Sequence, residues 1–374
     1  MKKSIVGISA VMGLGFLSVA HAQSSVTMYG IIDDGLTYAN NVGGHSQYAL
    51  VSGISQGSRW GIQGAEDLGG GMSALFKLEN GFNVNTGTLL QGSREFGRAA
   101  TMGLSSKQYG SLVLGRQNEM MGDYVGQYTA NGNWGILDPH PGDLDNTGID
   151  FRISNAVRYN SPTVWGLHGS ALFSFGGVAG DFNRNTVKSF GLNYVNGPIG
   201  VVSAFTTIDH PLAAVPEGVW SATNPIDGNY GIAASKYQTF GTAVQYSFSK
   251  ARIAIDYTNT KFLGLDQTLG AKISGHVTFD VIEAVASYMV RPDLQLGANY
   301  SFTDGHVSSS DKSPRYHTAG LIADYYLSKR TDVYVQGSYM RAAGDATVAA
   351  LTPTVVASDS KSQLAIRLGI RTKF

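Results

Sequence analysis

The sequence contains no cysteine and has few charged residues for its length. Of its 374 residues, 14% are Asp, Glu, Lys or Arg, whereas a soluble protein usually carries about 25%. The missing cysteine excludes a disulfide framework and any thiolate metal site. Basic and acidic residues balance at 27 each, so no cationic excess supports binding to nucleic acid. Long apolar runs are also missing, which excludes transmembrane helices.

Glycine and aromatic residues are abundant instead. The sequence has 48 Gly and 19 Tyr, and its mean hydropathy is −0.04 although 43% of residues are hydrophobic. An aromatic content of 10% with zero net charge is atypical of disordered chains. A chain with few charged residues and no long apolar runs is unlike a protein that is surrounded only by water.

The N-terminal segment has the pattern of a secretory signal peptide. A short basic start at Lys2 and Lys3 precedes an uncharged, mostly apolar stretch over residues 5–19, and small residues follow at Ala20 and Ala22. The pattern predicts a signal peptide over 1–22 and a single exported domain over 23–374. A membrane anchor is the alternative, but fifteen residues are too short to span a bilayer comfortably.

Alternation of apolar and polar residues with period two runs through most of the chain. In the last segment, Leu364, Ile366, Leu368 and Ile370 share one face, and Arg367 lies on the other. Only a strand can use this period. Sixteen strands are expected, near 25–38, 57–66, 72–82, 98–106, 111–117, 152–161, 166–176, 187–195, 199–209, 237–249, 251–262, 276–290, 293–303, 316–327, 331–341 and 361–374.

The polar face of these strands separates a soluble sandwich from a membrane barrel. That face is mostly small and neutral, whereas a soluble sandwich would present many Lys and Glu residues. Short and long connections alternate, the long ones over 83–97, 118–151, 210–236, 304–315 and 342–360. We therefore predict an all-β fold: a transmembrane antiparallel β-barrel of 16 strands in the bacterial outer membrane. Only the segment 276–290 shows no clear phase.

Several dispersed segments carry a family resemblance. They are Ser25–Gly30 (SVTMYG), Gly57–Gly71 (GSRWGIQGAEDLGGG), Phe76–Phe82 (FKLENGF), Phe96–Leu104 (FGRAATMGL), Gly110–Arg116 (GSLVLGR), Arg152–Tyr159 (RISNAVRY) and the terminal Phe374. Together they resemble the general diffusion porins of Gram-negative bacteria, of the trimeric sixteen-stranded kind found in beta-proteobacteria. The resemblance covers essentially all of 23–374.

The resemblance implies a homotrimer in which each subunit forms a water-filled channel. It also implies that the third extracellular loop, residues 118–151, folds inward and narrows the channel, with loop acids facing a wall of arginines. The wall residues implied by the resemblance are Arg59, Arg98 and Arg152, to which strand parity adds Arg158, and the loop acids are Asp123, Asp138, Asp143, Asp145 and Asp150. Strand parity independently directs Arg59, Arg152 and Arg158 inward. Arg98 is in phase with lipid-facing residues, so it needs a bulge or a position beyond the lipid band.

The expected function is passive diffusion of small hydrophilic solutes and ions, with weak anion selectivity set by charge at the narrowest point. The alternative is a substrate-specific channel with a solute-binding track, for which Trp134 is a possible lining residue. We expect the protein to have no enzymatic activity and to bind no cofactor. The motif G-x-S-x-G at Gly53–Gly57 precedes a strand, whereas a nucleophile elbow requires a strand followed by a helix.

Two further segments are predicted to have structural roles. Asp143 to Gly148 resembles the start of a calcium loop, but its twelfth position is Ser154 and not Glu. A lone histidine, as in the turn at His140, is more typical of structure than of a metal ligand, and no metal is predicted. The terminal Phe374 resembles the assembly signal of outer-membrane proteins. The expected partners are therefore outer-membrane lipid and lipopolysaccharide, the assembly machinery, and small solutes and ions, with no nucleic acid.

Overall fold

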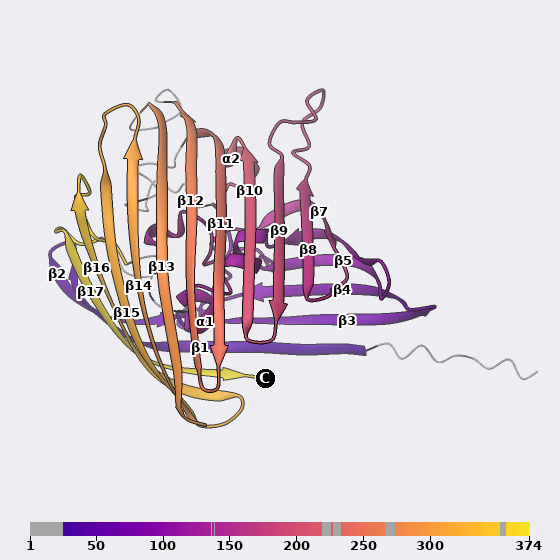
Figure 1. Cartoon of the computed structure of the whole chain (residues 1–374), viewed down its shortest axis with the longest axis horizontal. Helices are drawn as coiled ribbons and strands as arrows, with labels where there is room; N and C mark the ends of the chain where they lie inside the picture. Colours follow the sequence, from indigo (N-terminus) through magenta and orange to yellow (C-terminus); the bar gives the residue numbers. More distant parts are fainter. Residues whose placement is uncertain are drawn as a thin grey trace, which may run out of the picture.

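The chain folds into a closed antiparallel β-barrel (Figure 1). The computed structural model describes residues 25–135, 137, 139–218, 226, 233–266, 274–351 and 357–374, so the expected signal peptide over 1–22 lies outside the described residues. The strands are β1 (Ser25–Val42), β2 (His45–Ser52), β3 (Arg59–Gly69), β4 (Met72–Gly81), β5 (Ala99–Ser106), β6 (Gly110–Gln117), β7 (Ile153–Asn160), β8 (Leu167–Ser174), β9 (Val187–Asn196), β10 (Ile199–Asp209), β11 (Ala234–Phe248), β12 (Ala251–Leu265), β13 (Gly275–Arg291), β14 (Leu294–Val307), β15 (Pro314–Tyr326), β16 (Thr331–Gly344) and β17 (Ser362–Lys373).

These segments fill sixteen positions in the barrel, because β2 and β3 share one. Both pair with the same edge of β1: β2 with its second half, from Asp34 to Val42, and β3 with its first half, from Ser25 to Ile31. The sixteen-stranded fold expected from the sequence is thus confirmed. The sequence did not predict β2. This segment and β3 together form the second strand of the barrel, and residues 53–58 interrupt it.

The barrel closes between β1 and β17. The seam pairs Ile31 with Lys373 and Ala39 with Ala365. The pairing of β1 with β17 thus begins only at Ile31, whereas residues 25–31 pair with β3 on the other edge of β1. A barrel of tilted strands closes with a stagger, so the two terminal strands cannot be aligned end to end. Backbone hydrogen bonds in both directions between Gly30 and Phe374 complete the seam.

The two faces of the wall meet different surroundings. Large apolar side chains are exposed all around the outside, as at Met102, Phe190, Ile255 and Leu368, and they form the lipid-facing band. Strand β13 also alternates regularly, although its sequence showed no phase. Several of its inward residues are apolar and buried, namely Val277, Phe279, Val281 and Val285. Because both faces of β13 carry apolar residues, the sequence shows no alternation of apolar and polar residues there.

Short turns lie at one rim and long connections at the other. Lys107–Tyr109, Ser249–Lys250 and Pro292–Asp293 are among the tight turns. The described helical turns lie in the long connections: η1 (Met121–Val125), α1 (Ala130–Trp134), η2 (Pro141–Asp143) and α2 (Pro211–Ala214). None of the helices within the described ranges is long and apolar enough to cross a membrane.

Candidate functional site

The inward loop, residues 118–151 between β6 and β7, begins at a buried carboxylate. Glu119 is fully buried and accepts hydrogen bonds from the backbone N–H groups of Met121 (2.7 Å) and Gly122 (3.2 Å). It also accepts one from Asn146 Nδ2 at 2.8 Å and one from the Thr206 hydroxyl of β10. Burial raises the pKa of Glu119, and these donors oppose the rise. The carboxylate therefore ties both ends of the loop to one wall.

Further hydrogen bonds extend this attachment from β9 to β14. Met120 N–H donates to Ser189 Oγ (2.9 Å) on β9, and the Tyr237 hydroxyl on β11 donates to the carbonyl of Leu144 (2.9 Å). The Ser301 hydroxyl on β14 donates to the carbonyl of Pro139. Neutral partners thus hold the loop against the side of the barrel formed by β9 to β14.

Apolar packing fills the space between the loop and this wall. Met121 and Val125 are fully buried, and a Cβ atom at Gly241 would lie 2.7 Å from the Met121 methyl group. Trp134 is also buried, and a Cβ at Gly297 would lie 2.8 Å from its ring. Trp134 therefore packs against the wall. It is not among the residues that line the cavities described below.

The loop tip contacts the opposite side of the barrel at Ser55, in the connection that precedes β3. The Ser55 hydroxyl donates a 2.7 Å hydrogen bond to the carbonyl of Trp134. The next residue, Gly135, has φ +57°, and a Cβ there would lie 1.9 Å from the carbonyl oxygen of Ser55. Ser55 also accepts from Arg371 Nη1 at 2.9 Å. The serine of the G-x-S-x-G segment is thus a contact point for the loop.

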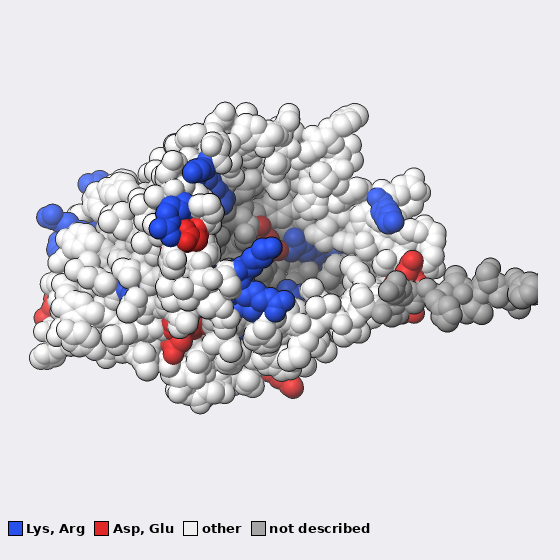
Figure 2. Space-filling view, turned by 90° about the horizontal axis from the view of Figure 1, so that it is seen from below, with Lys and Arg blue, Asp and Glu red and all other residues white. Residues whose placement is uncertain are grey.

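A cavity of about 910 Å³ lies between the loop and the side of the barrel formed by β2 and β3. Arg59, Arg98 and Arg152 all line it, and so do the loop acids Asp143 and Asp150. Figure 2 shows the molecule hollowed at its centre, with Lys and Arg side chains over the hollow. The structure thus brings three of the four predicted wall arginines together with two of the predicted loop acids.

Arg59 and Arg152 differ from Arg98, the other arginine that lines this cavity, in lacking an ion pair with an acidic residue among the described residues. Arg59 Nη1 donates to the carbonyl of Gly57 (3.3 Å) and Arg152 Nη1 to that of Asp150 (3.5 Å). Within the described ranges, neither guanidinium lies within 4.0 Å of a carboxylate. Burial and the positive charges of Arg98 and Arg116 lower the pKa of Arg152, but an arginine stays charged in such sites.

A second cavity of about 300 Å³ is lined by the remaining predicted cation, Arg158, with Asp123, Lys77, Glu79 and Arg98. Here the charges are paired. Arg158 forms an ion pair with Asp123, and Glu79 contacts Arg98 Nε at 2.8 Å and Lys77 Nζ at 3.2 Å. Arg98 lines both cavities. It precedes β5 by one residue, so strand alternation does not constrain its direction.

The predicted loop acids occupy different places. Asp123 lines the second cavity, while Asp143 and Asp150 line the first. Asp143 also accepts hydrogen bonds from the backbone N–H groups of Gly148 (2.7 Å) and Asp150 (3.1 Å). Asp145 is buried against β12, 2.6 Å from the Thr258 hydroxyl, and lines neither cavity. Asp138 lies outside the described residues.

Sequence reasoning missed several charged residues of the interior. Lys77 and Glu79 alternate with Phe76 and Leu78 on β4. This alternation directs both charged side chains inward, so the sequence could have predicted them as lining residues. The alternation placed Arg367 on the polar face of its strand, but it did not predict the role of this residue. It is fully buried, 3.1 Å from Asp33 Oδ1 across the closing seam. Arg371 likewise contacts Asp324 at 3.3 Å and Asp332 at 3.0 Å.

Comparison with known proteins agrees with this architecture. The model of the family described as Gram-negative porin matches residues 9–345. The chain belongs to the Gram-negative porin family. It lies in the bacterial outer membrane, where this porin forms a water-filled channel for passive diffusion of small hydrophilic solutes and ions. The family and its relatives are channels rather than enzymes.

Several relatives cover nearly the whole porin. An outer membrane porin protein of Bordetella pertussis is 29% identical over 91% of this chain and 94% of its own. Outer membrane porin protein 32 of Delftia acidovorans is 26% identical over the full length of both. The solved anion-selective porin from Comamonas acidovorans superposes with a TM-score of 0.76 at 22% identity, over 94% of this chain and 100% of that one. The trimer form of OmpT of Vibrio cholerae gives a TM-score of 0.67 at 15% identity, over 94% and 99%.

Proposed function

We propose that this porin is a homotrimer of weakly anion-selective channels, each narrowest between the inward loop and the arginines at 59, 98 and 152. The observation that carries the proposal is the pair of cations at Arg59 and Arg152, which lack a carboxylate within 4.0 Å in the described part of the chain and line the larger cavity. An unpaired fixed cation at a constriction attracts anions and repels cations.

The charges that line the two cavities favour anions only slightly. Five basic side chains, Lys77, Arg59, Arg98, Arg152 and Arg158, line them with four acidic ones, Glu79, Asp123, Asp143 and Asp150. Screening limits more distant charges to a reach of about 8–10 Å at physiological salt, so these nine groups dominate. The anion-selective porin among the structural neighbours supports the same sign.

A substrate-specific channel has less support. Such a channel needs a track of solute-binding groups, and aromatic rings are the usual platform. None of the described residues that line either cavity is aromatic. The lining consists mainly of Gly, Ser, Asn, Gln and the charged groups above, which suits hydrated solutes of many kinds.

Recording from planar lipid bilayers tests the proposal. We expect ohmic conductance that appears in steps of three, and a reversal potential of the anion-selective sign in a gradient of KCl. A cation-selective reversal potential would contradict the arginine argument and leave the channel itself intact. Single steps of conductance that never group in threes would contradict the trimer.

The terminal residue is proposed as an assembly signal. Phe374 is 49% exposed on the outside of the barrel, its ring lies over Gly30, and its backbone closes the seam. Deleting Phe374 should lower the amount of heat-modifiable trimer in outer-membrane fractions several-fold, because the seam loses two hydrogen bonds and the machinery loses its signal. The substitution Phe374→Tyr, which keeps the ring, is the control. Equal trimer in the deletion and the wild type would contradict this role.

A further inference from the structure

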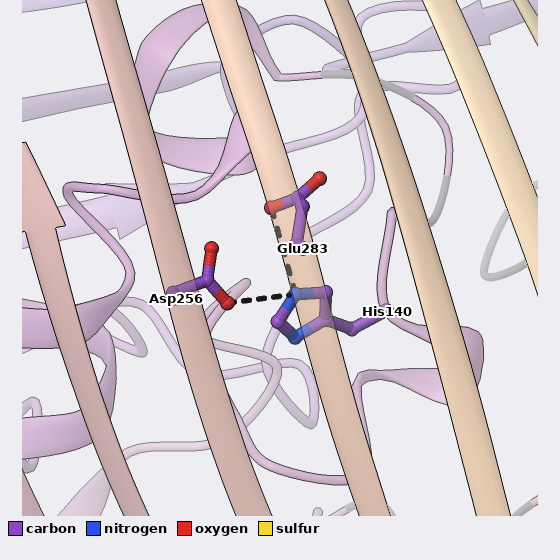
Figure 3. Close-up of side chains that lie close together, drawn as sticks. All are labelled: His140, Asp256 and Glu283. Carbon is purple, nitrogen blue, oxygen red and sulfur yellow. Dashed lines mark ion pairs between the residues drawn. The ribbon is translucent and has the colours of Figure 1, made fainter.

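Three ionisable side chains meet where the inward loop packs on the wall: His140 of the loop, Asp256 of β12 and Glu283 of β13 (Figure 3). All three are at most 1% exposed. His140 Nε2 lies 3.3 Å from Asp256 Oδ1 and 3.5 Å from Glu283 Oε2. One ligand atom from each residue lies within 4.8 Å of the other two.

The pairing of β12 with β13 places the two carboxylates directly opposite each other. Asp256 and Glu283 are register partners on neighbouring strands, and both face the interior. Like charges in directly opposed positions repel, and burial increases the repulsion because no water screens it. Within the described residues, the only ion pairs of these two carboxylates are with His140.

A set of outer contacts orients the cluster. His140 Nδ1 lies 2.7 Å from Asp145 Oδ2, and Asp145 in turn accepts from the hydroxyls of Thr258 (2.6 Å) and Thr147 (3.0 Å). Nδ1 therefore faces Asp145, and Nε2 points towards Asp256 and Glu283. A carboxylate behind the imidazole is the arrangement that supports metal-bound histidines.

Glu283 is oriented in the same way, whereas Asp256 is not. Glu283 Oε1 accepts from Asn299 Nδ2 (2.7 Å), and Oε2 accepts from Ala130 N–H (3.0 Å). Both oxygens of Asp256 lack a hydrogen-bond partner among the described residues, and so does His140 Nε2. A buried carboxylate whose oxygens lack well-aligned donors is costly, because it has lost its water, and here it has only the contact with His140 in exchange.

We propose that His140, Asp256 and Glu283 bind a divalent transition-metal ion of the zinc type. Tetrahedral zinc sites have bonds of about 2.0–2.1 Å to nitrogen and oxygen, which places neighbouring donor atoms about 3.3–3.4 Å apart. The two distances from Nε2, 3.3 and 3.5 Å, match this spacing. Two positive charges balance the opposed carboxylates, Oδ1 of Asp256 serves as the third protein ligand, and a water molecule would take the fourth position.

The proposed ion would join three elements that are far apart in the sequence. His140 lies within the inward loop, and the two carboxylates belong to adjacent wall strands. A metal bridge at this place fixes the loop against β12 and β13, and so fixes the width of the channel on its other side. The ion is therefore structural, since all its ligands are buried and the cavity-lining residues are different ones.

Metal analysis of the refolded full-length porin tests the proposal. Untagged protein is refolded in detergent without lipopolysaccharide, which binds divalent ions itself, and is then incubated with Zn²⁺ and freed of excess ion. We expect about one zinc per chain by elemental mass spectrometry. With Co²⁺ in place of Zn²⁺, we expect the intense visible absorption of a four-coordinate site.

Substitutions identify the ligands. The variants His140→Gln and Asp256→Asn should each bind less than about a tenth of the zinc of the wild type. Asp256→Asn removes the repulsion between the carboxylates and is expected to fold. The matched control is His210→Gln, because His210 also contacts an aspartate through Nδ1, at 2.8 Å from Asp209, but is only partly buried and has no second acidic neighbour among the described ion pairs. Wild-type protein without stoichiometric zinc, or a His140→Gln variant that retains it, would overturn the proposal.

Discussion

The two sides of the barrel interior differ in what they offer the inward loop. The side from β9 to β14 meets it with buried hydroxyls, backbone partners and apolar side chains, whereas the side formed by β2 and β3 touches it at Ser55 and is otherwise separated from it by the cavity. One side therefore holds the loop in place, and the other presents charge to the passing solute. The proposed constriction needs both properties, and in this porin they lie on different strands.

The largest effect is expected on the side that holds the loop. Replacing Glu119 by Ala leaves the N–H groups of Met121 and Gly122 and two side chains without their acceptor, at about 1–3 kcal/mol for each buried donor. We expect thermal unfolding at lower temperature, together with a larger and noisier single-channel conductance. Glu66→Ala on the exposed part of β3 is the control and should leave both unchanged. Unaltered conductance in the Glu119 variant would show that the wall holds the loop without it.

The next effect concerns the charged side. The double variant Arg59→Gln/Arg152→Gln leaves three basic and four acidic side chains around the cavities, so we expect the reversal potential in a KCl gradient to change sign. The charge-preserving pair Arg59→Lys/Arg152→Lys should keep the anion preference. If both double variants behave alike, fixed charge is not the origin of the selectivity.

A smaller effect is expected at the Ser55 contact between the two sides. At Gly135 an added Cβ would lie 1.9 Å from the carbonyl oxygen of Ser55, in a backbone with φ +57°. Gly135→Ala should displace the loop tip and raise single-channel conductance, because the tip can no longer sit against the connection at 53–58. The matched control is Gly177→Ala, since Gly177 has φ +68° and no neighbour within 4 Å. Equal conductance in the two variants would exclude a role for the contact.

The smallest effect is expected in the second cavity. Glu79 neutralises part of the charge of Arg98 and Lys77, so Glu79→Gln should shift the reversal potential modestly further in the anion-selective direction. Tyr29 donates a 2.7 Å hydrogen bond to Glu79, and Tyr29→Phe removes this bond without changing any charge. A shift of the same size in Tyr29→Phe would mean that local structure, rather than charge, sets the potential.

The same contrast explains what the sequence could predict. Alternation was clear where one face meets lipid and the other meets water, so a strand was expected near each of the sixteen strand positions, but the segment β2 was missed and several strands, among them β1 and β14, extend further than expected. It failed at β13, where several inward residues are apolar as well. Arg59 and Arg152 could be directed inward by parity, but Arg98 could not, because it precedes its strand. Asp143 lines the larger cavity, whereas Asp145 is buried against β12. This difference depends on how the loop folds over the wall, and no local sequence pattern predicts that fold.

The seam between β1 and β17 has a consequence for how the chain reaches this state. Arg367 and Asp33, which meet there, are 334 residues apart, and the last residue of the chain bonds to Gly30. Contacts of such sequence separation form slowly, since nearly the whole chain must be ordered before they become favourable. Until the final strand arrives, β1 presents an open edge that can pair with other chains. The barrel therefore closes only after its final strand has been synthesised, and the interval before closure is when the nascent porin is most exposed to aggregation.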